Sequence, residues 1–96
     1  MSRRVVFKFR LYVVRDAPSS MQALANLTAL CRERLAGRHK IEVVDVFQSP
    51  ERALADGIIL TPTLLRLMPT PLRTIVGALT GPQDLAHVLG LAPPPA

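Results

Sequence analysis

The sequence predicts a single α/β domain with the element order β-α-β-α-β-β-α, and three observations favour it. Residues 5–14 alternate between apolar and other side chains, as in a strand with one buried face. Apolar residues then recur at helical spacing between Met21 and Leu35. Finally, Pro62 interrupts the apolar run between Ile58 and Met68, and proline within a sheet is confined to edges, strand starts and bulges.

Length and composition indicate one folded domain. The chain has 96 residues, of which 49% are hydrophobic, enough for one modest core. No apolar run approaches the roughly 20 residues of a membrane span, and Lys8 and Arg10 interrupt an N-terminal run that resembles a signal peptide. We therefore expect a cytoplasmic protein with a folded domain over residues 1–91 and a flexible proline-rich tail over residues 92–96.

The net charge of +5 favours an acidic partner. The basic residues are spread along the chain, and only 4% of the residues are aromatic, so few side chains could stack on bases. We expect an acidic protein surface as the target, and neither nucleic acid nor a membrane. The one cysteine, Cys31, excludes an internal disulfide and a metal site built from cysteines alone.

The first helix is expected to begin with a capping box, in which a serine hydroxyl at Ser19 is followed three residues later by Gln22. We expect it to end at Gly37, in the left-handed conformation that glycine favours after a helix. Its buried stripe is expected to contain Met21, Leu24, Leu27 or Thr28, Cys31 and Leu35. Within that stripe, Cys31 is predicted to be a small core residue rather than a reactive thiol, since free cysteine is commonly buried.

The second strand is predicted over residues 41–47, which are rich in β-branched side chains. Their near-continuous apolar character favours a central strand covered on both faces and reached by a right-handed parallel crossover. Residues 49–51 (SPE) then predict a helix start, with a hydroxyl cap, a proline at the first helical position and an acid in the first turn. This short helix is expected to stop at Gly57, with Asp56 at its end.

The second half predicts a hairpin and a last helix. Residues 63–68 are only weakly strand-like, because Leu and Met are better helix formers than strand formers. Residues 69–71 (PTP) force a turn before a strand over residues 72–76, and residues 80–83 (TGPQ) start a helix that ends at Gly90. With a parallel first pair and a final hairpin, this order is the thioredoxin-like arrangement.

Catalysis is not predicted. In thioredoxin-like proteins, the reactive cysteines lie at the start of the first helix, where free N–H groups and the helix dipole stabilise a thiolate, and residues 16–20 contain no cysteine. A serine in this segment could activate a bound thiol, although a helix cap is the favoured interpretation. His39, expected in a solvated loop, and His87 lack metal-ligand spacing, while Asp45 is a candidate buried carboxylate without an evident partner. We expect no enzyme activity, no cofactor and no metal.

Four short motifs between residues 9 and 80 match the pattern of one protein family in order, with no insertion or deletion between them. Residues 10–13 (RLYV) are similar to a K-L-Y-V strand, and residues 43–46 (VVDV) to a V-I-D-V strand. Residues 61–64 (TPTL) are identical to a T-P-T-L motif, and residues 73–79 match an R-x-I-x-G-x-L strand. Together these motifs resemble the KaiB family of circadian-clock proteins.

The resemblance implies a non-catalytic protein that binds a KaiC-type ATPase ring and modulates its phosphorylation and ATPase cycle, in circadian or stress-related timing. It also implies a homo-oligomer, dimer or tetramer, when free, and a C-terminal half that can exchange the thioredoxin-like fold for another packing. Candidates for cis peptide bonds and for that exchange are Pro62, Pro69 and Pro71. The implied contact surface comprises Arg10, Lys40, Glu42, Asp45, Pro62, Arg66 and Arg73.

Some positions depart from the family pattern. Cyanobacterial members carry Ala and Lys where this chain has Lys40 and Glu42, and the family's G-L-D near the end of the last helix is here residues 88–90 (VLG). Two alternatives stay open at the level of sequence. One is a small thiol- or glutathione-binding protein, and the other is the interaction module of a sensor histidine kinase system.

Overall fold

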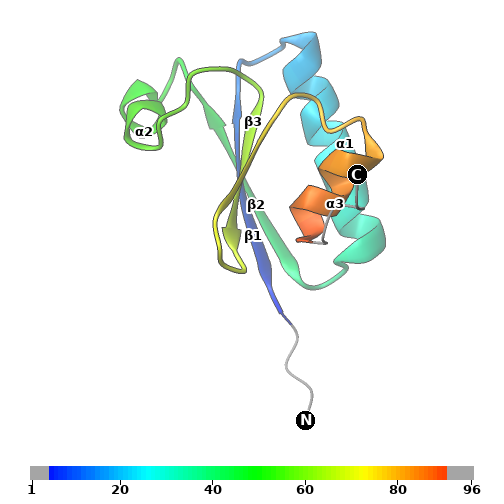
Figure 1. Cartoon of the computed structure of the whole chain (residues 1–96). Coiled ribbons are helices and arrows are strands. Elements are labelled where there is room, and N and C mark those ends of the chain that lie inside the picture. Colours follow the sequence, from blue (N-terminus) through cyan, green and yellow to red (C-terminus); the bar gives the residue numbers. More distant parts are fainter. Residues whose placement is uncertain (1–4, 91–96) are drawn as a thin grey trace.

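The computed structural model describes residues 5–90, which form one sheet with helices on both faces (Figure 1). The elements are β1 (Phe7–Val13), α1 (Pro18–Arg34), β2 (His39–Asp45), α2 (Pro50–Ala55), β3 (Thr63–Met68), β4 (Arg73–Val76) and α3 (Pro82–Leu89). This is the order predicted from the sequence. The predicted tail, residues 92–96, lies outside the described residues.

The four strands form one mixed sheet in the order β2-β1-β3-β4. β1 pairs in parallel with β2 and antiparallel with β3, and β3 and β4 form an antiparallel hairpin. The parallel crossover and the final hairpin are therefore as predicted. In Figure 1, α1 and α3 lie on one face of the sheet, and α2 lies beyond the other, near the end of β2.

β1 is the strand that both layers of the core share. The side chains that it contributes to the main core, beneath α1 and α3, are Phe7, Phe9, Leu11 and Val13. On the opposite face Tyr12 is fully buried in a second cluster with Val44, Ala53 and Leu65. The alternation in the sequence therefore predicts correctly which side chains of β1 are buried beneath α1 and α3. It does not predict the burial of Tyr12 on the opposite face, where Ala53 of α2 packs against it.

β2 is an edge strand, so the prediction of a central strand covered on both faces is wrong. Only Val44 is buried among its residues, and 46% of Val43 is exposed. An apolar, β-branched run favours a strand but does not show how many strands flank it. The strand also begins earlier than predicted, so His39 lies in β2 and not in a loop, with Nδ1 2.8 Å from the Leu35 carbonyl oxygen.

α1 does not begin with the predicted capping box. The cap is Ala17, which makes no side-chain hydrogen bond to the helix, and Pro18 follows as the first helical residue. Ser20 Oγ instead accepts a hydrogen bond from the Val14 backbone N–H at 3.0 Å. The buried residues of the helix are consequently Ser20, Ala23, Leu27, Leu30 and Cys31, while Met21 is exposed.

The prediction that Cys31 is a core residue is confirmed. Its side chain is fully buried, and burial raises the pKa of the thiol to about 11. The helix is capped at Leu35, and Gly37 follows with a left-handed φ of 72°. Glycine meets that conformation at little cost, as expected for the residue after a helix.

The segment of ambiguous propensity, Thr63–Met68, is the strand β3, and most of its side chains are buried. The peptide bonds that precede Pro62, Pro69 and Pro71 are all cis. The last two prolines lie in the predicted turn to β4. The final helix, α3, ends at Gly90 with a left-handed φ of 78°, as predicted.

Candidate interaction surface

A charged network joins β1, β2 and α2 on the face of the sheet toward α2. Its members are Arg10 and Tyr12 of β1, Glu42 of β2, and Arg52 and Asp56 of α2 and its cap. Glu42 Oε1 accepts hydrogen bonds from Arg10 Nε at 2.8 Å and Arg52 Nη2 at 2.9 Å. Asp56 Oδ2 accepts from Arg10 Nη1 at 2.9 Å and from the Tyr12 hydroxyl at 2.5 Å.

Sequence spacing explains why these side chains meet. Arg10 and Tyr12 are two residues apart, so they point to the same face of β1. In the parallel register Arg10 lies directly opposite Glu42. Arg52 and Asp56 are four residues apart, which places them on one side of the helix and its cap.

The network keeps its charges at neutral pH. Hydrogen bonds, first from Arg52 and then from Arg10, lower the pKa of Glu42 to about 2. The pKa of Asp56 is also lowered, chiefly by the hydrogen bond from Tyr12. Because 46% of the Glu42 side chain is exposed, its ion pairs contribute little stability, and their main effect is to hold the charges in one orientation.

Two lysines extend this charged surface. Lys8 and Lys40 lie directly opposite each other on β1 and β2, and both are exposed. Neither forms an ion pair with any of residues 5–90. We call the whole set the charged sheet face: Lys8, Arg10, Lys40, Glu42, Arg52 and Asp56.

Large apolar side chains are exposed on α2 and on the segments before and after it. Phe47 follows β2 and is 77% exposed, and Leu54 of α2 is 79% exposed. Ile59 and Leu60, which lead into β3, are 92% and 60% exposed. Aromatic and apolar side chains beside fixed charges are typical of surfaces that a protein partner covers.

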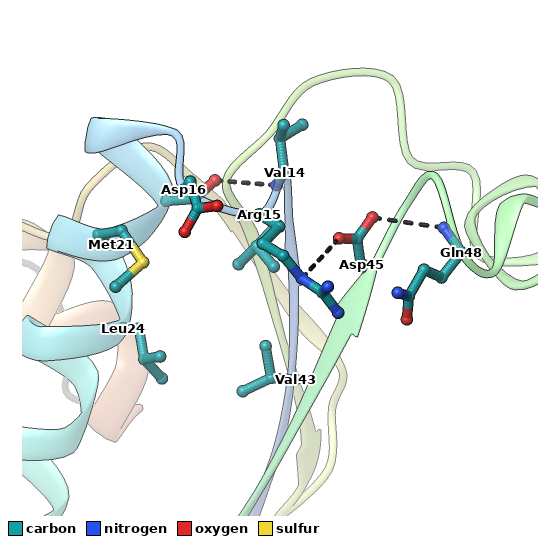
Figure 2. A pocket seen from close by; sticks show the side chains of 10 residues that line it. Val14, Arg15, Asp16, Met21, Leu24, Val43, Asp45 and Gln48 are labelled. Atoms are coloured by element: carbon teal, nitrogen blue, oxygen red, sulfur yellow. Dashed lines mark hydrogen bonds and ion pairs between the residues drawn. The ribbon is translucent and has the colours of Figure 1, made fainter.

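A pocket of about 240 Å³ lies between the start of α1 and β2 (Figure 2). The labelled side chains around it are Val14, Arg15, Asp16, Met21, Leu24, Val43, Asp45 and Gln48. Asp45 Oδ1 accepts hydrogen bonds from the backbone N–H groups of Phe47 at 2.8 Å and Gln48 at 3.3 Å, and Oδ2 lies 3.8 Å from Arg15 Nε. The carboxylate therefore closes the turn after β2, with backbone partners that the sequence did not reveal.

This pocket lies where thioredoxin-like proteins place their reactive cysteines, but it does not assemble a thiol-binding site. The Ser20 hydroxyl accepts from the Val14 N–H, and neither Ser19 nor Pro62 lines the pocket. Pro62 is buried, and its carbonyl accepts a hydrogen bond from the Gly77 N–H at 2.9 Å. The geometry therefore gives no support to the glutathione-binding alternative.

Two of the predicted contact residues, Arg66 and Arg73, lie on the other face of the sheet. Arg66 is only 2% exposed, and it donates from Nη2 to the Pro71 carbonyl at 3.0 Å and from Nη1 to the Val88 carbonyl at 3.4 Å. Burial, and then repulsion by Arg73, lowers the pKa of Arg66. Because its guanidinium is enclosed, we leave Arg66 out of the candidate interaction surface.

The structure thus brings three of the seven predicted residues together on the charged sheet face: Arg10, Lys40 and Glu42. Its other members, Lys8, Arg52 and Asp56, were missed, as was Tyr12 of the network. The four-residue spacing of Arg52 and Asp56 was a usable signal, whereas nothing local in the sequence shows that Tyr12 is covered by α2.

Within residues 5–90, no helix is long and apolar enough to span a membrane. The same residues hold no cluster of three or more His, Cys, Asp or Glu side chains that could bind a metal ion.

Solved structures share the fold at low sequence identity. The N-terminal domain of Synechococcus elongatus SasA superposes with a TM-score of 0.72 and 17% identity, over 94% of this chain and 89% of that domain. Chloroplastic thioredoxin z superposes with a TM-score of 0.70 and 16% identity, over 91% of this chain and 81% of the other. These matches confirm the thioredoxin-like fold.

Sequence relatives identify the family. The circadian clock protein KaiB3 of Synechocystis sp. is 34% identical over 84 residues, which are 88% of this chain and 82% of the relative. The circadian clock oscillator protein KaiB of Prochlorococcus marinus is 39% identical over 80 residues, 83% of this chain and 67% of the relative. The KaiB domain model matches residues 10–91. The chain therefore belongs to the KaiB family of clock proteins.

Proposed function

We propose that this protein is a non-catalytic regulator that binds a KaiC-type ATPase ring through the charged sheet face and modulates its phosphorylation and ATPase cycle. The observation that carries the proposal is the pair Lys8 and Lys40, exposed and directly opposite each other beside an ordered network. Like charges directly opposite each other destabilise a sheet. An acidic side chain from a partner would convert that repulsion into an attraction.

Charge defines the partner surface. Four basic and two acidic side chains leave the charged sheet face with a net charge of +2, which fits an acidic partner. Arg10 and Arg52 hold the Glu42 carboxylate in place, so the partner meets a fixed pattern of charges. Phe47 and Leu54, both highly exposed, would supply the apolar anchors that such interfaces need.

The first experiment is native mass spectrometry of the protein mixed with the KaiC homologue from the same source, with ATP or ADP. The expected result is a ring that carries several copies of this chain. Absence of a complex with either nucleotide would refute the proposed function.

A charge reversal then tests the surface. Lys40→Glu should weaken the complex and reduce its salt sensitivity, because it removes attraction to an acidic partner. Arg32→Glu is the matched control, since Arg32 is exposed on α1, away from the sheet face toward α2. Equal losses for the two variants would place the contact elsewhere.

The same proposal covers the state and location of the free protein. We propose a cytoplasmic homo-oligomer, dimer or tetramer, that yields monomers to the ring. The exposed Phe47, Leu54 and Ile59 are the surface available for self-association. Sedimentation velocity over a range of concentrations measures this directly, and a monomer at every concentration would contradict it.

A further inference from the structure

Arg66 of β3 and Arg73 of β4 form a cross-strand pair with unusual electrostatics. They are directly opposite in the antiparallel register, so their side chains share the face of the sheet toward α3. Arg66 is 2% exposed and Arg73 is half-buried. The Nε atoms of both are buried and have no hydrogen-bond partner among residues 5–90.

Nothing in the described chain neutralises this pair. The ion pairs found within residues 5–90 involve other arginines, so neither guanidinium has a carboxylate partner. Removing a charge from water is costly unless it is paired, and each buried unsatisfied polar group calls for an explanation such as a bound ion. The carbonyls of Val88 and Pro71 offset part of this cost for Arg66 but offer nothing to either Nε.

The C-terminal end of α3 explains only part of the arrangement. Helix ends of this kind carry a partial negative charge of about half a unit, which favours one nearby cation. Two adjacent guanidinium groups exceed that charge. A ligand with one or two negative charges and several acceptor oxygens would balance the pair.

We propose that Arg66 and Arg73 bind a small tetrahedral oxyanion of the phosphate class. A guanidinium presents five N–H donors in a planar fork that suits phosphate oxygens. Arg66 uses one Nη1 and one Nη2 donor on carbonyls, which leaves its Nε–H and two further N–H groups. Arg73 is half-buried and therefore lies on the solvent side of the pair, from which an ion would enter.

The proposed site is separate from the ATPase surface. Arg66 and Arg73 point toward α3, whereas Arg10 and Glu42 point toward α2 on the other face of the sheet. Ion binding can therefore be measured on the free protein and does not depend on the proposed function. A failure of either proposal leaves the other standing.

The test titrates inorganic phosphate into the free protein, with sodium chloride at matched ionic strength as the control. We expect saturable shifts of backbone amide signals around Leu72, Arg73 and Gly90 in two-dimensional NMR, together with a phosphate-dependent rise of the unfolding midpoint. Arg73→Gln should weaken phosphate binding by about tenfold or more, as expected for the loss of one charged donor group. Arg32→Gln should leave it unchanged.

Two results would overturn the proposal. One is a response to phosphate no larger than the response to chloride, which would mean that the carbonyls of Val88 and Pro71 suffice. The other is wild-type affinity in Arg73→Gln. Arg66→Gln should also lose phosphate binding. If that variant does not fold, Arg73→Gln, at the less buried of the two positions, still tests whether the pair binds phosphate.

Discussion

Tyr12 is expected to hold α2 on the sheet through its hydroxyl, which contacts the Asp56 carboxylate and the Arg52 carbonyl, and Tyr12→Phe removes only that hydroxyl. The side chain is fully buried, and its hydroxyl donates to Asp56 Oδ2 at 2.5 Å. A hydrogen bond to a charged group contributes about 1.5–3 kcal/mol. Asp56 keeps its bond from Arg10 and is 27% exposed in its side chain, so water replaces part of the loss. We therefore expect Tyr12→Phe to lower the free energy of unfolding by about 1–2 kcal/mol.

Urea unfolding at neutral pH measures this loss, and a double-mutant cycle with Asp56→Asn assigns it. The cycle should give a coupling energy of about 1 kcal/mol, because Tyr12→Phe removes the donor and Asp56→Asn removes the charge of the acceptor in the same hydrogen bond. The Arg52 carbonyl, 3.1 Å from the hydroxyl, also accepts the Asp56 N–H and so stays paired in Tyr12→Phe. If the two variants lower the free energy of unfolding independently, with a coupling energy near zero, the loss does not come from the Tyr12–Asp56 hydrogen bond.

The pH dependence provides a second check on Tyr12. The hydrogen bond lowers the pKa of Asp56 in the folded state, so it stabilises the fold above the unfolded pKa of about 4 and less as pH falls. Tyr12→Phe should therefore differ from the wild type at pH 7 and converge toward it in acid. A constant difference across the pH range would contradict this account.

Three further outcomes follow from other contacts. The pKa of Glu42 is about 2 against an unfolded value of 4.5, so its contribution, small because the side chain is 46% exposed, is full above pH 4.5 and is lost as pH falls toward 2. Glu42→Gln should remove this small pH dependence over that interval, and an unchanged profile would count against the network. Cys31 should resist iodoacetamide at pH 8 in the folded protein and react readily in urea, and equal rates would mean that its burial is wrong. Gly90→Ala should cost about 1 kcal/mol or more, since the new Cβ would lie 2.5 Å from Arg66 Nη1 at a left-handed φ. The matched control is Gly37→Ala, which has similar φ but open space, and equal losses would remove the role of the contact.

The fold could be predicted from sequence because its signals are local. The alternation in residues 5–14, the helical spacing after Met21 and the prolines at positions 62, 69 and 71 each depend on near neighbours in the chain. The place of β2 at the edge depends on which strand pairs on the other side of β1, and that strand, β3, lies about twenty residues further along the chain. No local pattern in residues 39–45 carries that information.

The candidate site was predicted in part for a related reason. Period-two spacing predicts that Arg10 lies on the face of β1 opposite Phe9 and Leu11, and the resemblance singled out Lys40 and Glu42. Arg66 was included as a basic side chain near Pro62, whereas its strand position directs it beneath the end of α3. Its burial depends on a helix that begins sixteen residues later, which sequence spacing does not reveal.

Glu42 shows how this chain can differ from the family pattern without changing its fold. A carboxylate at this edge position is neutralised by Arg10 across the sheet and by Arg52 from α2, so the change of charge is compensated within the chain. The fold therefore tolerates a glutamate at position 42, and the changed charge affects only what binds at the exposed side of β2. Lys8 and Lys40 lie next to it and form no ion pair among residues 5–90, so under the proposed function they favour a partner of negative charge. We therefore propose that divergence at this edge changes the charge pattern that a partner must match.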